Sequence, residues 1–131
     1  MNLLEAALES RQFFIVALVL SLLFGYGGLV HLGNALGRGE YAWSKVALRF
    51  KVADVFWGAL DFAALIGTLL RSPVGPACLV VAAVTQIAAY GLFPGFFAMK
   101  QDHLRVLRGM VVFHLAVLVV LGVSFLIAVA T

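Results

Sequence analysis

The stretch VADVFWGALDFAALIGTLL, residues 52–70, decides how this chain folds. Its only charged residues are Asp54 and Asp61. A segment of about 20 apolar residues crosses the roughly 30 Å hydrocarbon core of a bilayer, so the stretch is typical of a transmembrane helix. A carboxylate at the middle of such a helix costs about 2.5–3.5 kcal/mol on insertion scales. Asp61 must therefore face a partner, a water-filled cavity or a proton.

Three further apolar blocks of similar length accompany this stretch. The chain of 131 residues is 64% hydrophobic and 11% charged, whereas a soluble domain is about half apolar and a quarter charged. We therefore predict an all-α fold: a polytopic four-transmembrane-helix bundle that forms one integral membrane domain over residues 1–131. The predicted spans are residues 12–32, 52–70, 73–93 and 109–130.

The basic residues are unevenly distributed between the predicted loops. The loop before the second span holds Arg38, Lys45, Arg49 and Lys51, and the loop before the fourth holds Lys100, Arg105 and Arg108. The opposite side has only Arg11 and Arg71. Because short loops rich in Lys and Arg stay in the cytoplasm, we predict a multi-pass protein of a bacterial-type inner membrane with both termini periplasmic. The net charge of +3 relates to this topology and to anionic headgroups on the cytoplasmic side rather than to nucleic acid.

The loop before the second span carries an amphipathic pattern. Over Tyr41–Phe50, apolar residues recur at helical spacing, while Lys45 and Arg49 lie four apart on another face. We predict a short amphipathic helix in the cytoplasmic interface, and we favour simple anchoring over a separate lipid-binding function. The residues predicted to contact lipid headgroups are Trp43, Lys45, Arg49 and Lys51.

Small and polar residues mark the helix faces that are expected to pack together, because lipid tails are as apolar as leucine. Asp61 shares such a face with Asp54, so we predict that it points into the bundle. The predicted contact faces are Ser21, Gly25 and Gly28 in the first span, Asp54, Gly58, Asp61, Leu65 and Thr68 in the second, and Ala82, Gln86 and Ala89 in the third.

The polar residues inside the spans are the candidates for chemistry. Asp61 lies ten residues past Lys51, or about 15 Å from the cytoplasmic interface at 1.5 Å per residue. A role as a hydrogen-bonded link between helices and a role in handling a proton or substrate are equally favoured for it. For Asp54, an ion pair with Lys51 is favoured, and a relay with His31 is the alternative. The candidate path from midplane to cytoplasm is Gln86, Asp61, Tyr90, His114, Asp54 and His31.

Two histidines raise the question of a cofactor. His31 and His114 lie in the cytoplasmic halves of the first and fourth spans, where they could ligate a b-type haem through axial histidines. A metal site that adds Asp54 and Asp61 to these histidines is a further alternative. Neither has a sequence motif, since the chain contains no HExxH and no closely spaced His/Cys set. We therefore expect no cofactor, no metal site and no catalytic constellation.

The end of the first span carries a resemblance to a known family. The sequence runs from Arg11 to Phe24-Gly-Tyr-Gly-Gly-Leu-Val-His31-Leu32. It resembles the first helix of the DoxX-like small membrane proteins, which have an arginine before the span, glycines late in it, and a basic residue followed by leucine at its end. The lysine usual in that family corresponds to His31 here. The resemblance implies a four-helix plan and an association with membrane redox or quinone-linked systems.

These observations favour a non-enzymatic accessory or assembly subunit of a membrane complex, with lipids and either other membrane subunits or further copies of itself as partners. One alternative is a small oligomeric proton-coupled transporter or channel that uses Asp61 and Asp54. A second alternative is a haem- or quinone-binding redox subunit. The surroundings of Asp61 distinguish the first two: a dry, hydrogen-bonded site favours a structural role, and a water-filled crevice that passes Asp54 favours transport.

Overall fold

The computed structural model describes residues 2–98 and 100–131, and this part of the chain has an all-α fold. Its elements in chain order are α1 (Leu3–Glu9), α2 (Arg11–Ala35), the 3-10 turn η1 (Trp43–Lys45), α3 (Leu48–Leu69), α4 (Val74–Leu92), α5 (Pro94–Phe97) and α6 (Gln101–Ala130). Of these, α2, α3, α4 and α6 are long and apolar enough to span a membrane.

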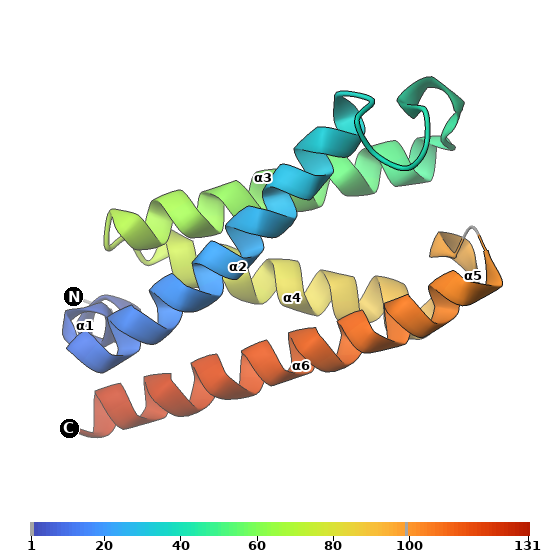
Figure 1. The fold of residues 1–131 in the computed structure, drawn as a ribbon. Helices are drawn as coiled ribbons and strands as arrows, with labels where there is room; N and C mark the ends of the chain where they lie inside the picture. Colours follow the sequence, from blue (N-terminus) through green and yellow to red (C-terminus); the bar gives the residue numbers. More distant parts are fainter. Residues whose placement is uncertain (1, 99) are drawn as a thin grey trace.

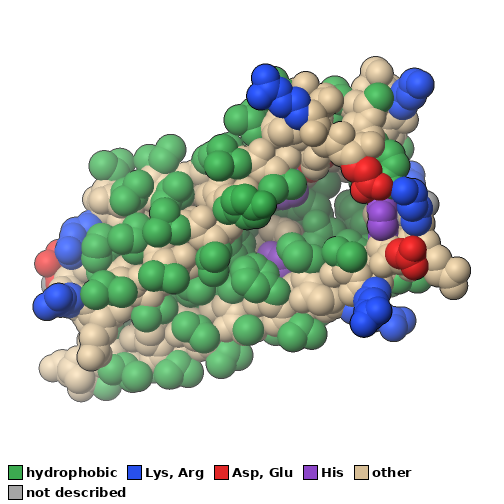
Figure 2. All heavy atoms as spheres, viewed as in Figure 1, with side chains coloured by type: hydrophobic (Ala, Val, Ile, Leu, Met, Phe, Trp, Pro, Cys, Tyr) green, Lys and Arg blue, Asp and Glu red, His purple; other side chains and the backbone are tan. Residues whose placement is uncertain are grey.

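The four long helices lie lengthwise along one another (Figure 1). Helix α2 packs on α3, α3 on α4 and α4 on α6, while α1 contacts α2 and α6. Both termini lie at one end of the molecule, and the α2–α3 loop lies with α5 at the other. Lys and Arg side chains gather at these two ends, and hydrophobic side chains cover much of the surface between them (Figure 2). This distribution is the one expected for a multi-pass membrane protein, with an apolar belt between charged ends.

Each predicted span coincides with a long helix to within one residue or lies inside it. The largest differences are at two helix starts: α3 begins four residues before its predicted span and α6 begins eight residues before. These extensions contain charged residues such as Lys51 and Arg105, which hydropathy excludes from a span. Lys and Arg are good helix formers, and their long side chains reach from a helix end to the headgroup layer. The helices therefore continue beyond the apolar blocks.

The amphipathic helix predicted over Tyr41–Phe50 does not form as a separate element, so that prediction was wrong. Only the three residues of η1 are helical before α3 begins at Leu48. Val46 and Ala47 lie between the two elements with extended ψ angles of 144° and 149°. A helix of two or three turns is marginal without a surface to pack against, so the last residues of the segment join the longer helix α3 instead.

The residues predicted to contact headgroups differ in their surroundings. Lys45 is exposed. The ammonium group of Lys51 lies 5.9 Å from the centroid of the Trp43 ring. The Arg49 guanidinium lies 4.7 Å from the centroid of the Phe96 ring, and Arg49 Nε donates a hydrogen bond to the Phe96 carbonyl at 2.8 Å. Two of the three cations therefore contact aromatic rings, and one of them ties the start of α3 to α5.

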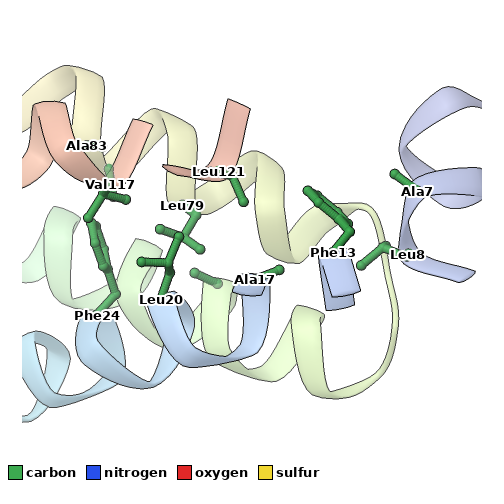
Figure 3. Packing of buried hydrophobic residues seen from close by; sticks show 12 residues of the cluster. Ala7, Leu8, Phe13, Ala17, Leu20, Phe24, Leu79, Ala83, Val117 and Leu121 are labelled. Atoms are coloured by element: carbon green, nitrogen blue, oxygen red, sulfur yellow. The ribbon is translucent and has the colours of Figure 1, made fainter. Parts of the chain in front are cut away.

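The hydrophobic core lies mainly where α1, α2, α4 and α6 meet (Figure 3). Lipid provides no hydrophobic drive for helices to associate, so close packing and polar contacts hold them together. The alanines of the core serve this purpose because their short side chains let neighbouring backbones approach. The buried residues are Ala7 and Leu8 from α1, Phe13, Ala17, Leu20 and Phe24 from α2, Ala64 from α3, Leu79, Ala82 and Ala83 from α4, and Val117 and Leu121 from α6.

Helices α2 and α3 pack through the predicted small and polar faces. Near the terminal end of the molecule, Ser21 Oγ lies 2.9 Å from Thr68 Oγ1. Nearer the loop end, a Cβ added at Gly28 would lie only 3.2 Å from the Cβ of Asp61. A side chain at Gly28 would therefore separate the two helices. The contact faces predicted for the first two spans do meet, and this register brings the polar residues of α2 and α3 together.

Helix α3 ends in a Schellman motif that has an arginine where glycine is usual. Arg71 adopts the left-handed conformation with φ 52°. Its N–H donates to the Thr68 carbonyl at 2.9 Å, and the N–H of Ser72 donates to the Gly67 carbonyl at 2.8 Å. Helix α2 ends in the same way, with Gly37 at φ 72°. The left-handed conformation costs free energy for a residue with a side chain but not for glycine. The contacts of the Arg71 side chain must therefore offset this strain.

Arg71 ties the α3–α4 turn to α1. Its Nη1 donates to the Leu8 carbonyl at 3.0 Å, and its guanidinium lies 4.0 Å from the centroid of the Phe14 ring. Arg71→Ala should lower the free energy of unfolding by about 1–2 kcal/mol, because both contacts are lost. Arg71→Gly loses the same contacts but removes about 1 kcal/mol of left-handed strain, so it should be less destabilising. Thermal unfolding in mild detergent compares the two, and a glycine variant less stable than the alanine variant would contradict this account.

Candidate functional site

One imidazole lies between two carboxylates in the loop half of the molecule. His31 Nδ1 on α2 lies 2.6 Å from Asp54 Oδ1 on α3, and His31 Nε2 lies 4.0 Å from Asp61 Oδ2. The first distance is that of a hydrogen bond, whereas the second is too long for one. We call these three residues the Asp61–His31–Asp54 cluster.

Gly58 makes room for the imidazole between the two carboxylates. Asp54, Gly58 and Asp61 follow one another at helical spacing on the face of α3 that contacts α2. A Cβ added at Gly58 would lie 3.1 Å from the Cβ of His31. Because Gly58 has no side chain, the imidazole of His31 packs directly across this position. One carboxylate lies on each side of the imidazole.

Asp54 is held by two donors from the end of α2. Its Oδ1 accepts from His31 and from Asn34 Nδ2, the latter at 3.1 Å. The predicted ion pair between Asp54 and Lys51 does not form, and Lys51 contacts the Trp43 ring instead. A same-helix pair of this kind contributes only about 0.2–0.5 kcal/mol. The close approach of α2 supplies a shorter, partly buried partner, and this explains why the prediction was wrong.

Asp61 lies deeper than Asp54, on the other side of His31. It is 2% exposed, and its Oδ1 has no hydrogen-bond partner among the residues that the structure describes. A Cβ added at Gly27 would lie 2.9 Å from its Oδ2, so this glycine leaves the space that the carboxylate occupies. The prediction that Asp61 points inward is confirmed. A buried carboxylate without full hydrogen bonding is costly, so Asp61 requires either a proton or the charge of His31.

A cleft of about 240 Å³ opens beside the cluster. His31 and Asp54 line it, whereas Asp61 does not, so the imidazole lies between the cleft and the deeper carboxylate. Figure 2 shows the surface hollowed toward the loop end, with histidine side chains in view. The cleft is also lined by six aromatic residues: Tyr41, Trp43, Phe50, Trp57, Tyr90 and Phe97.

Three of these rings pack together, and we call Trp57, Tyr90 and Phe97 the aromatic wall. The ring centroids of Trp57 and Tyr90 are 5.2 Å apart, and each lies 5.8 Å from that of Phe97. Trp57 Nε1 donates a hydrogen bond to Thr85 Oγ1 at 3.1 Å, which fixes the orientation of the indole. Angled aromatic pairs add about 0.5–1.5 kcal/mol each beyond their buried area, so the wall is preorganised before any ligand binds.

The edge of the cleft is joined to the start of α6 by two contacts, one from the N-cap residue Lys100 and one from His103. Lys100 Nζ lies 3.0 Å from Glu40 Oε1, and the ring centroid of Tyr41 lies 6.4 Å from that of His103. The hydrogen bond and charge of Lys100 lower the pKa of Glu40, and Glu40 in turn raises the pKa of Lys100. The ion pair therefore persists between these two shifted pKa values. It is lost when Glu40 binds a proton at low pH or Lys100 releases one at high pH.

Four of the six residues on the predicted polar path lie at the cluster or in the cleft wall. Gln86 does not join them: it is buried on α4, and no hydrogen bond links its amide to Asp61 within the described structure. The Asp61 side chain lies against Gly27 and Gly28 of α2 rather than against α4. The four residues are Asp61, His31, Asp54 and Tyr90.

His114, the remaining residue of the path, is hydrogen-bonded to its own helix. Its Nδ1 lies 2.6 Å from the Met110 carbonyl oxygen, and its ring packs edge-on against Phe24 with centroids 5.5 Å apart. It does not line the cleft that His31 lines, so this geometry gives no support to a haem held between the two. Among the residues that the structure describes, no group of three His, Cys, Asp or Glu side chains is placed to hold a metal ion.

Sequence reasoning missed three residues of the site. Asn34 follows His31 by three residues, and Trp57 follows Asp54 by three. Helical spacing puts each pair on one face, so this signal was present in the sequence. Phe97 belongs to α5, a single turn between α4 and α6, and its contact with Trp57 has no counterpart in local spacing.

Comparison with known proteins does not assign this cluster. No protein-family model matches the chain, and neither a curated protein nor a solved structure matches it. The basis for inferring a function is therefore the geometry itself: a cleft, an imidazole in its wall and a buried carboxylate behind that imidazole.

Proposed function

We propose that this chain is a small multi-pass membrane protein that couples proton transfer to transport, with Asp61 as the buried proton-binding group. In this proposal α2, α3, α4 and α6 cross a bacterial-type inner membrane, with the basic loops cytoplasmic and the termini outside. The plan is that of a DoxX-like small membrane protein. The excess of Lys and Arg in the loops supports this orientation.

The position of His31 carries the proposal. Its Nδ1 is bonded to Asp54 in the cleft wall, and its Nε2 faces Asp61 behind it. With Nδ1–H donated to Asp54, a proton arriving from the cleft binds at Nε2, and Asp54 stabilises the imidazolium that forms. Movement of about 1 Å would bring Nε2 within hydrogen-bonding range of Asp61. Motion of α2 against α3 thus controls proton transfer across the 4.0 Å gap between His31 and Asp61.

The depth of Asp61 explains why transfer must be coupled to a conformational change. Ten helical residues separate Asp61 from Lys51, a rise of about 15 Å in a hydrocarbon core of about 30 Å. Beyond Asp61, toward the termini, the interior holds packed core residues such as Leu20 and Phe13. A proton that enters from the loop side therefore stops at Asp61. Release to the other side requires rearrangement of α2 or a pathway completed by a second copy.

Proton flux in vesicles tests the proposal. The protein is reconstituted with a pH-sensitive dye inside the vesicles, and flux is driven by an imposed pH gradient. Asp61→Asn keeps the shape of the side chain but cannot carry a proton, so flux should fall by about 100-fold or more. The matched control is Asp102→Asn, which removes an exposed carboxylate at the start of α6 and should leave flux unchanged. Equal flux in wild type and Asp61→Asn, or none in either, would overturn the proposal.

A second candidate function is that of an accessory or assembly subunit, and the exposure of α6 favours it. Within the most apolar part of α6, 17% of residues are buried, compared with 33–39% in α2, α3 and α4. A helix with so few internal contacts has a wide apolar face for partner helices or a second copy, as well as for lipid. Native mass measurement in mild detergent tests this function. A strictly monomeric protein with intrinsic transport activity would exclude it.

A further inference from the structure

Asp54 has one carboxylate oxygen committed to the protein and one that is not. Oδ1 accepts the hydrogen bonds from His31 and Asn34. Oδ2 receives none from the residues that the structure describes, although Asp54 lines the cleft. The cleft volume of about 240 Å³ is that of roughly eight water molecules at about 30 Å³ each. The space beside Asp54 therefore admits a small organic molecule.

The lining of the cleft favours a cation in this space. The faces of aromatic rings attract ammonium groups, and the aromatic wall supplies Trp57, Tyr90 and Phe97 beside Asp54. Two other rings of the cleft already contact cations, because the Lys51 ammonium lies 5.9 Å from the Trp43 centroid and the Lys100 ammonium lies 5.4 Å from the Tyr41 centroid. Within the described structure, no Lys or Arg lies over a ring of the aromatic wall.

The charge of the cluster also favours a bound cation. With one mobile proton, the Asp61–His31–Asp54 cluster carries a net charge of −1 whether that proton is on Asp61 or on His31. A net charge is costly at this depth in a membrane, so the cluster gains from one further positive charge. That charge can be a second proton or a bound cation, and the two then compete. The other titratable groups that line the cleft are Glu40, Tyr41, Tyr90 and His103, and the positive charge of Lys100 is balanced by Glu40.

We propose that the cleft binds a small alkylated ammonium cation, with Asp54 Oδ2 as its charge partner and the aromatic wall against its alkyl groups. This inference rests on the proposed function, because the bound cation replaces a proton of the same cluster. The transported substrate would then be an organic ammonium compound that exchanges for protons. The same ammonium chemistry exists in free solutes and in choline lipid headgroups.

Binding of choline and of its uncharged carbon isostere, 3,3-dimethyl-1-butanol, tests the inference. Intact protein in mild detergent is titrated with each compound, and binding is followed by tryptophan fluorescence and calorimetry. Choline should bind at least about tenfold more tightly than the isostere, and it should bind less tightly as the pH is lowered. Asp54→Asn should weaken choline binding by at least about tenfold, whereas the control Asp102→Asn should leave it unchanged.

Equal affinity for choline and the isostere would overturn the inference, and this comparison needs no variant to fold. Unchanged choline binding in Asp54→Asn would also overturn it. Repeating the titration in nanodiscs separates the two sources of the ammonium group: a headgroup ligand would weaken apparent choline binding in phosphatidylcholine relative to phosphatidylglycerol, and a free solute would not. The two proposals fail separately. Choline binding without Asp61-dependent proton flux would refute the proposed function alone, and flux without choline binding would refute this inference alone.

Discussion

Replacing His31 with glutamine should slow proton transfer to Asp61 by about 100-fold, the scale of effect expected when a positioned acid–base group is lost. Glutamine has a similar reach and can still donate a hydrogen bond to Asp54, but its amide does not take up a proton near neutral pH. The helices should therefore remain packed while the link from the cleft to Asp61 is broken. Proton flux in reconstituted vesicles, normalised to the amount of folded protein, measures this effect.

His114→Gln is the matched control for this prediction. His114 is more deeply buried than His31, but its Nδ1 bonds to the Met110 carbonyl of its own helix and it does not line the cleft. Flux in the folded His114→Gln protein should therefore equal that of wild type. Comparable losses in the two variants would show that flux depends on either histidine inside the helix bundle, and would contradict the role assigned to His31.

The largest effect on stability is expected at the α3–α4 turn. A Cβ added at Gly67 would lie 2.6 Å from the backbone nitrogen of Gly75 and 2.8 Å from its Cα. Backbone atoms in a turn cannot move aside as the end of a side chain can, so Gly67→Ala must separate α3 from α4. Overpacking of this kind costs about 1–3 kcal/mol, and Gly67→Ala should lower the free energy of unfolding by at least that much.

Gly122→Ala provides the control for the same chemical change. Gly122 lies within α6, and a Cβ added there meets nothing within 4 Å. Alanine is favoured over glycine in a helix by about 0.8–1 kcal/mol, so Gly122→Ala should be neutral or stabilising. Thermal unfolding of both variants in the same detergent compares them. A Gly67→Ala protein as stable as Gly122→Ala would show that the turn is looser than the structure indicates.

The sequence was sufficient to predict the four long helices and the orientation of Asp61 because both depend on local periodicity. An apolar block of spanning length forms a helix in any arrangement of its neighbours. The spacing of Asp54, Gly58 and Asp61 places them on one face of that helix. A face that is small and polar must turn away from lipid, and the structure shows this face packed against Gly28 and His31.

The sequence offered His31 only as the alternative partner of Asp54, because local spacing favoured Lys51. Lys51 is three residues away along the helix, whereas His31 is 23 residues away and becomes a neighbour only when α2 packs on α3. The close approach at Gly58 decides between them, and it depends on the backbones of both helices. A prediction from spacing along one helix therefore favours partners on that helix too strongly. A neighbouring helix that packs against it can supply a better-placed donor.

The cleft has the weakest signal in the sequence because six separate segments form it. They contribute, in chain order, His31 from α2, Tyr41 from the following loop, Asp54 from α3, Tyr90 from α4, Phe97 from α5 and His103 from α6. No pair among the segments shares a sequence period that would reveal the contact. His114 shows the converse problem: its depth made it a candidate for the polar path, but its hydrogen bond returns to its own helix.

The central claim is that Asp61 exchanges a proton with the cleft through His31. Difference infrared spectroscopy of the protein in lipid tests it directly, since a protonated carboxyl group has its own carbonyl band and Asp61→Asn identifies the one that belongs to Asp61. We predict that this band changes with the pH of the medium, that it shifts in D₂O, and that the shift is slower in His31→Gln. A band of Asp61 that neither responds to pH nor exchanges with D₂O in the folded protein would contradict the claim and leave Asp61 as a purely structural contact.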